Sequence, residues 1–213
     1  MNIDIIQKIS HFNQRNKKSI EIIAITKTHP FEVVVDAYKH GLRHIGENRV
    51  EEAINKIDLA RQNNINDICW HMIGHVQSRK VRDVVSFFDR VDSVDSIELL
   101  QKLNAEAHKQ HKMLRVLLEV NISREQTKYG FEEIPKNLMY SNLVIDGLMT
   151  MAPYTTNPED NRWIFKKMKE ISLGTPTIGS TLSMGTSCDY TVAIEEGATE
   201  VRLGEALFGK RTI

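Results

Sequence analysis

Short apolar runs alternate with amphipathic segments along the whole chain. Each run has the length of a β-strand and ends in polar or glycine-bearing residues, and the segment that follows has helical periodicity. The pattern predicts eight strands, at residues 21–27, 43–48, 70–75, 89–95, 114–122, 143–151, 181–185 and 200–204.

The segments between the runs carry recognisable helix boundaries. Apolar side chains recur on one face after Pro30, and Gly41 follows where a C-terminal cap is expected. Asn157 precedes a proline and a glutamate, a combination typical of a helix start. Ser187 is expected to cap the helix before the last strand, and a further helix, about residues 3–15, precedes the first strand.

Alternating strands and helices indicate parallel strands joined by right-handed crossovers. Several runs are apolar at consecutive positions, as expected when both faces of a sheet are buried. Eight such units favour a closed barrel over an open sheet. We therefore predict an α/β fold, a single (β/α)₈ TIM-type barrel domain over residues 1–213, with the N-terminal helix closing the bottom of the barrel.

The balance of charge narrows the choice of partners. The 213 residues contain 28 basic and 28 acidic side chains, so the chain lacks the basic excess of a nucleic-acid or membrane-surface protein. Two cysteines, Cys69 and Cys188, are too few for a disulfide framework or a thiolate zinc site. The polar-interleaved N-terminus is not a signal peptide, and we expect a cytoplasmic protein.

The chemistry is expected where the strands end, because the sites of such barrels lie at their C-terminal face. Lys27 ends an otherwise apolar run. Desolvation there lowers the pKa of an ammonium group, and the neutral amine can condense with an aldehyde to form a Schiff base. The alternative is a lysine that extends from a strand end into water.

The last two predicted strands run into loops that suit an anion. Ser183 and Gly185 precede two hydroxyl residues, and Arg202, Gly204 and Glu205 follow the same strand-to-helix arrangement. Barrels often bind phosphate between these two loops, although serine and glycine are also ordinary turn residues. A Schiff-base lysine and a phosphate cradle together suit an aldehyde that carries a phosphate.

With these residues in place, the chain resembles the YggS/PROSC family of pyridoxal 5′-phosphate (PLP) homeostasis proteins, which have a barrel of the alanine-racemase type. The segments that carry the resemblance lie in order through most of the chain, at residues 24–28, 46–50, 70–80, 121–123, 128–130, 147–151, 182–187 and 201–209. Together they are highly specific, although none of them would be so alone.

The resemblance implies that Lys27 forms the internal aldimine with PLP. It implies further cofactor contacts on both sides of the barrel mouth, from Asn48, His75, Met149, Ser183, Gly185, Arg202, Gly204 and Glu205. Among these, Arg202 would face the pyridine nitrogen, where a permanent cation makes the ring a weaker electron sink. The chain departs from the commonest family pattern at His75, often a proline, and at Arg79, often an asparagine.

Two functions share such a site, a carrier that supplies PLP to apo-enzymes and a racemase-like enzyme. A racemase needs a second acid–base group on the other face of the cofactor, and Tyr154 is the best tyrosine available for it. The chain stops soon after the last strand and so lacks the racemases' second domain, which favours a monomeric carrier without turnover. A third hypothesis for the function is a barrel enzyme that acts on a phosphorylated sugar without a cofactor. No metal site is expected, since nothing completes one around His71 and His75.

Overall fold

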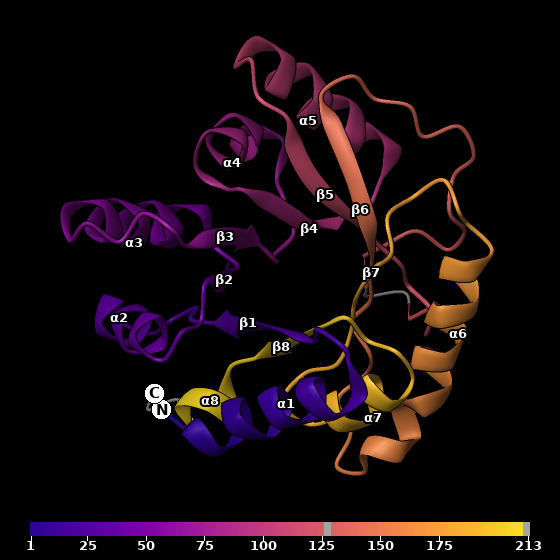
Figure 1. Cartoon of the computed structure of the whole chain (residues 1–213). Helices are drawn as coiled ribbons and strands as arrows, with labels where there is room; N and C mark the ends of the chain where they lie inside the picture. Colours follow the sequence, from indigo (N-terminus) through magenta and orange to yellow (C-terminus); the bar gives the residue numbers. More distant parts are fainter. Residues whose placement is uncertain (126–128, 211–213) are drawn as a thin grey trace.

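The structure, a computed structural model, describes residues 1–125 and 129–210. Within them, eight parallel strands close into a barrel in chain order, and β1 pairs with both β2 and β8 (Figure 1). The strands are β1 (Glu21–Ile25), β2 (His44–Glu47), β3 (Cys69–Met72), β4 (Arg90–Val94), β5 (Leu114–Glu119), β6 (Leu143–Met149), β7 (Thr181–Ser183) and β8 (Glu200–Leu203). The predicted TIM-type barrel is therefore confirmed.

Helices surround this barrel on its outer face (Figure 1). They are α1 (Ile3–Asn16), α2 (Phe31–Lys39), α3 (Val50–Gln62), α4 (Val81–Phe87), α5 (Ile97–Lys109), α6 (Arg162–Leu173), α7 (Tyr190–Glu195) and α8 (Glu205–Phe208), with 3₁₀ turns η1 (Ser78–Lys80) and η2 (Pro158–Asn161). The described part of the connection between β5 and β6 contains no helix. Among the described residues, no helix is both long and apolar enough to cross a lipid bilayer.

The N-terminal helix is present, but its predicted place at the bottom of the barrel is wrong. α1 lies outside the barrel beside α7 and α8 (Figure 1). Its buried residues Ile5 and Ile9 join the outer hydrophobic core, and the amide of Asn2 donates to the carbonyl of Leu207 at 2.7 Å. Because α8 has only four residues, α1 supplies apolar cover that a longer last helix would provide.

The outer core lies between the strands and the helices. Apolar residues of each strand enter it, such as the alternate residues Ile22 and Ala24 of β1, and they meet the apolar faces of the helices. This burial is the main favourable contribution to folding. The outward face of each strand is thereby committed to stability, so the inward face and the strand ends remain available for chemistry.

The interior of the barrel contains charge. Arg90 of β4 forms an ion pair of two hydrogen bonds with Glu200 of β8, at 2.5 and 2.8 Å, and its Nε lies 2.6 Å from Asp92 Oδ1. Since β4 and β8 are not neighbours, this contact must cross the barrel. Asp92 also accepts from His71 Nδ1 at 3.2 Å. Buried charges of this kind persist only when they are paired, and these pairs tie opposite walls together.

Two local predictions differ from the structure. β3 ends at Met72, so His75 lies in the following loop and not at the strand end. Ser187 does not cap α7, which begins at Tyr190 with Asp189 before it. The Ser187 hydroxyl instead accepts hydrogen bonds from the amide of Gly204 at 3.3 Å and from a second amide of that loop. Ser187 therefore accepts from amides at the start of α8, and not from those of α7, the helix that follows it directly in the sequence.

Candidate functional site

Lys27 lies in a turn just beyond the end of β1 and is half-buried. Because β1 pairs with β2 and β8, the turn stands between the strand ends that carry Asn48 and Gly204. Thr28, the next residue, has a φ of 65°. A residue other than glycine seldom adopts this left-handed conformation, and it persists only where surrounding contacts impose it.

A network that reaches from the buried Glu47 to the exposed Thr28 supplies those contacts. Thr26 Oγ1 donates to Glu47 Oε1 at 2.5 Å, and Lys56 Nζ donates to the same oxygen at 2.7 Å and to the Thr26 carbonyl at 2.8 Å. Lys56 also donates to Glu52 Oε1 at 2.7 Å, an oxygen that accepts from the Thr28 amide at 2.5 Å. The backbone on both sides of the candidate lysine is thus fixed to β2 and α3.

The carboxyl group of Glu47 is fully buried in this network. Burial raises its pKa above the ordinary 4.5, and the hydrogen bonds from Lys56 and Thr26 oppose the rise. Its Oε2 has no hydrogen-bond partner among the described residues. Since an unpaired buried carboxylate is costly, the Lys56 ammonium is what makes the charged form of Glu47 tolerable.

Asn48 and His75 line one pocket, with a volume of about 200 Å³, which also includes Arg79. The Oδ1 of Asn48 is buried and has no partner among the described residues. His75 lies at the outer rim, where Nδ1 is 2.8 Å from Asp95 Oδ2 and the ring stacks on Tyr129 with centroids 4.0 Å apart. Asn48 therefore offers an available acceptor, whereas His75 is already engaged at the rim.

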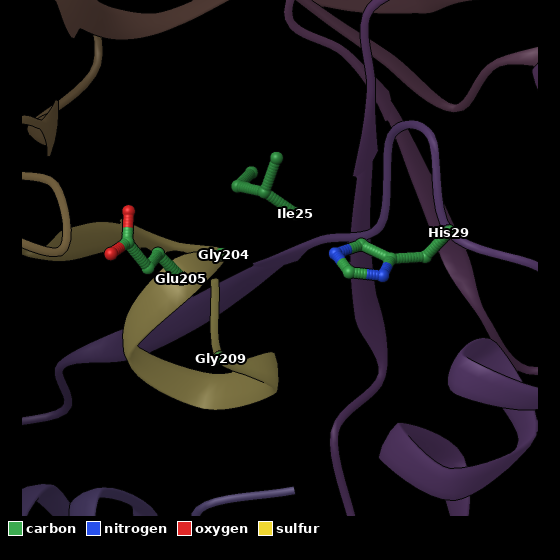
Figure 2. A pocket seen from close by; sticks show the side chains of 5 residues that line it. All are labelled: Ile25, His29, Gly204, Glu205 and Gly209. Atoms are coloured by element: carbon green, nitrogen blue, oxygen red, sulfur yellow. The ribbon is translucent and has the colours of Figure 1, made fainter. Parts of the chain in front are cut away.

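A larger pocket of about 310 Å³ opens between the ends of β1 and β8. Figure 2 shows the His29 ring and the Glu205 side chain on either side of Ile25, with the backbone of Gly204 at the start of α8. A Cβ at Gly204 would be in ordinary van der Waals contact with Ile25, 3.4 Å from its carbonyl oxygen. Because Gly204 has no side chain, its backbone lines this pocket directly, beside the turn that carries the candidate lysine.

Arg202 occupies the wall of the barrel beside this pocket and is almost fully buried. Its Nη1 donates to the Ser183 carbonyl at 2.7 Å and to Ser183 Oγ at 2.8 Å, while Nη2 donates to the Thr150 carbonyl at 2.7 Å. Burial lowers the pKa of the guanidinium, but the group stays charged because its ordinary pKa exceeds about 12. Met149, also buried, pairs in register with Ser183.

The loop after β7 is held by residues that sequence reasoning missed. Asp189 Oδ1 accepts from the Thr186 amide at 2.7 Å, and Asp189 Oδ2 accepts from Asn161 Nδ2 at 2.8 Å. Gly185 has a φ of 89°, and a Cβ there would lie 2.5 Å from the Ala193 Cβ. Glycine is thus required at this turn for both conformation and space.

The predicted residues therefore form three adjoining groups at the same end of the barrel. Lys27 comes from β1, Asn48 and His75 follow β2 and β3, and the third group of Met149, Ser183, Gly185, Arg202, Gly204 and Glu205 belongs to β6–β8. In the sequence, only Thr26, which follows the apolar β1, and Glu47, at the end of β2, indicate the network beneath Lys27. Its Lys56 partner belongs to a helix whose charges look like those of any exposed face.

These groups fit a small aromatic aldehyde that carries a phosphate. The orphaned Asn48 Oδ1 is an acceptor for a hydroxyl or protonated group, and the pocket beside Gly204 has the volume of small-ligand sites. Backbone amides at the start of a helix suit phosphate oxygens. Arg202 presents its fixed cation on the same side of the barrel. The residues present are those that such a cofactor needs.

Comparisons with known proteins agree with this geometry. A family model described as the alanine racemase N-terminal domain matches residues 4–212. A pyridoxal phosphate homeostasis protein of Aquifex aeolicus is 36% identical over 222 residues, which cover 97% of this chain and 93% of the relative. The chain therefore belongs to the pyridoxal phosphate homeostasis protein family, whose barrel is of the alanine racemase N-terminal domain type.

Solved structures give the same picture. PipY of Synechococcus elongatus, solved with PLP bound, has a TM-score of 0.82 and 31% identity, over 95% of this chain and 99% of that chain. An alanine racemase of Clostridium difficile has a TM-score of 0.74 at 17% identity, and the match spans 95% of this chain but 57% of the racemase. The second likeness shows the shared barrel fold alone.

Proposed function

We propose that this protein binds pyridoxal 5′-phosphate through Lys27 and takes part in its intracellular supply, without turnover of its own. The observation that carries the proposal is the pairing of β1 with β8. It places the half-buried lysine next to the glycine-lined pocket at Gly204. The homologous PipY, with PLP bound, supports the same ligand.

Each group of residues has a distinct part in this proposal. Lys27 would hold the cofactor covalently through its amine, and the cofactor would supply the aldehyde that condenses with this amine and loses water. Ser183, Gly185, Gly204 and the amide of Glu205 would hold the phosphate. Asn48 would offer an acceptor to the ring, Met149 would offer an apolar surface to it, and His75 would close the rim.

Arg202 bears on the choice between carrier and enzyme. When bound, PLP supplies an electron sink that stabilises negative charge on an attached amino acid. A guanidinium beside the ring nitrogen disfavours protonation of that nitrogen, and so weakens the sink. Arg202 is held by three oxygens of the barrel wall and cannot swing away without leaving them. The site therefore suits retention of the cofactor better than turnover.

The racemase-like alternative requires acid–base groups on both faces of the cofactor. Tyr154, the tyrosine that the sequence offers, is 86% exposed. The rim residues His75 and Tyr129 are stacked on each other. These positions favour the carrier, which as a cytoplasmic monomer would pass PLP to apo-enzymes.

Absorption spectroscopy with borohydride reduction tests the binding proposal. The protein loaded with PLP should show the visible band of a lysine-bound aldehyde, and peptide mapping after reduction should find the cofactor on Lys27. Lys27→Ala should lose the band, while Lys169→Ala, on an exposed face of α6, should keep it. A protein without the band, or with the label elsewhere, would contradict the assignment and favour the cofactor-free sugar-phosphate reading.

Two further measurements separate carrier from enzyme. Loaded protein is incubated with each amino acid in deuterium oxide, and exchange of the α-hydrogen is followed by mass spectrometry. Exchange at catalytic rates would overturn the carrier proposal. Transfer of PLP to an apo-enzyme faster than spontaneous dissociation would support direct delivery.

A further inference from the structure

Three metal-ligating side chains gather at the end of the barrel opposite the candidate cofactor site. His44 begins β2, Cys69 begins β3, and the two residues are partners in the parallel register. His71 lies two positions after Cys69, so both project from the same face of β3. One ligand atom from each of the three residues lies within 4.8 Å of the others.

The register between β2 and β3 brings these residues together, and for that reason the cluster could not be predicted from the sequence pattern. In the sequence, His71 is closest to His75, but the structure separates their side chains. His75 contacts Asp95 at the rim, whereas His71 is buried inside the barrel against Asp92. The partner of His71 is His44, which lies 27 positions earlier.

The two imidazole rings meet through one nitrogen each, in a hydrogen bond that a bound cation would replace. His44 Nδ1 and His71 Nε2 face each other at 2.9 Å. The other nitrogen of each ring faces a carboxylate, with His71 Nδ1 at 3.2 Å from Asp92 and His44 Nε2 at 4.0 Å from Glu21. His71 has the arrangement of histidines that bind metals, in which a carboxylate on the far nitrogen fixes the ring and makes the near nitrogen a better donor. At 4.0 Å, Glu21 contributes negative charge near His44 but no hydrogen bond.

The surrounding charge also suits a cation. Asp92, Glu200 and Glu21 present three carboxylates around the cluster, and the guanidinium of Arg90 pairs with the first two of them. The excess of negative charge lies in a partly dehydrated interior, where a divalent ion interacts with it more strongly than in water. His44 keeps 27% of its side chain exposed, which gives an ion a route from solvent.

We propose that His44 Nδ1, Cys69 Sγ and His71 Nε2 bind a divalent cation of the Zn²⁺ class, with water as the fourth ligand. A set of two imidazoles and one thiolate matches this borderline-soft ion and its tetrahedral geometry. On binding, the Cys69 thiol and the imidazole pair release protons to solvent. The ion would join β2 to β3 at the base of the barrel, which is a stabilising and not a catalytic position.

This inference is independent of the proposed cofactor. No residue of the cluster belongs to the groups at the mouth of the barrel. Loss of PLP binding in Lys27→Ala would leave the metal proposal intact, and absence of metal binding would leave the cofactor proposal intact.

Cobalt substitution tests the site in the full-length protein. Protein treated with a chelator and dialysed is titrated with Co²⁺ under reducing conditions, and difference spectra cancel any absorption of bound cofactor. We expect one Co²⁺ per chain, with visible bands of tetrahedral cobalt and a thiolate-to-cobalt charge-transfer band. Zn²⁺ should displace the cobalt and abolish both features.

Three variants assign the ligands. Cys69→Ser should lose the charge-transfer band, and both it and His44→Gln should weaken binding by more than about 10- to 100-fold, the loss caused by removing even an outer partner. Cys188→Ser, which changes the other cysteine, should bind as the wild type does. Circular dichroism confirms folding, and because His44 and Cys69 are partly exposed, neither replacement opens the buried core.

Thermal unfolding gives a second readout. Because the ion would bind the folded chain, Zn²⁺ should raise the melting temperature of the wild type and of Cys188→Ser, but not of Cys69→Ser or His44→Gln. Absence of stoichiometric binding by the wild type would overturn the proposal, and so would an unchanged charge-transfer band in Cys69→Ser. Either result would leave the imidazole pair as a hydrogen bond only.

Discussion

Lys56 Nζ lies 2.7 Å from Glu47 Oε1, and both side chains are buried beneath the turn that carries Lys27. The pair spans α3 and β2, and through the Thr26 carbonyl it also holds the end of β1. The proposed role of Lys27 depends on where its backbone is held, and Lys56 fixes the backbone beside it. The pair is therefore the support of the candidate site.

We expect Lys56→Met to destabilise the protein by about 3 kcal/mol, because it leaves the buried Glu47 carboxylate without its countercharge. The variant should also bind PLP more weakly, since the turn at Thr28 loses its support. Urea unfolding and PLP titration measure the two effects. Lys167→Met, which breaks an exposed pair with Glu170, should change the free energy of unfolding by less than about 0.5 kcal/mol. Equal effects of the two variants would contradict a supporting role for Lys56.

Stability should depend on pH through Glu47. Burial raises the pKa of Glu47 in the folded protein above 4.5, the ordinary value that applies to the unfolded chain. At a pH between these two pKa values, the folded state holds a proton that the unfolded state has lost. The contribution is complete below 4.5 and declines as pH rises toward the folded pKa. Subtracting the free energy of unfolding of Glu47→Gln from that of the wild type isolates this contribution, which should decrease with rising pH from about 4.5. A difference that increases over that range would show that Lys56 outweighs burial.

The turn at Gly185 offers a test with an internal control. Gly185 and Gly197 both have positive φ, but an added Cβ would meet Ala193 at 2.5 Å in the first and its nearest atom, on Lys169, at 3.6 Å in the second. Gly197→Ala should cost about 1 kcal/mol from backbone strain. Gly185→Ala should cost about 1–3 kcal/mol more from overpacking, and should also reduce PLP affinity. Chemical denaturation of both variants measures the difference, and equal costs would refute the clash.

Asn48 should matter for the cofactor and not for folding. Because its Oδ1 has no partner among the described residues, Asn48→Ala removes no hydrogen bond from that atom. The free energy of unfolding without PLP should stay within about 0.5 kcal/mol of the wild type, while PLP affinity should fall by up to about tenfold, the equivalent of one hydrogen bond. Asn63→Ala, at the exposed end of α3, is the matched control for PLP affinity. An unchanged affinity in Asn48→Ala would exclude this contact.

The strands and their order could be predicted from the sequence because the signal for a strand, a short apolar run with a polar end, is local. The apolar run predicted at residues 114–122, for example, begins where β5 begins, although β5 ends three residues earlier, at Glu119. The same reasoning predicted that Lys27 and the loops at Ser183 and Gly204 share one end of the barrel, since a closed barrel brings all C-terminal strand ends together. These features need only the alternation and the closure.

Features that depend on register or on the partner of a helix could not be read in this way. His44 and His71 face each other because of the register between β2 and β3, and a shift of one residue in that register would separate them. Serine is a common helix cap, yet the hydroxyl of Ser187 accepts hydrogen bonds from amides beyond the end of the next strand. The place of α1 depends on the shortness of α8, which its own sequence does not reveal.

The seam between β1 and β8 has a consequence for biosynthesis. The candidate lysine is made early and the glycine pocket beside it late, with Ala24 and Leu203 paired across the seam. A nascent chain on the ribosome would thus carry the Lys27 amine long before β8 is made. Under the proposed function, synthesis of the last strand would complete both the barrel and its ligand site, so that the unfinished chain would not yet hold the cofactor.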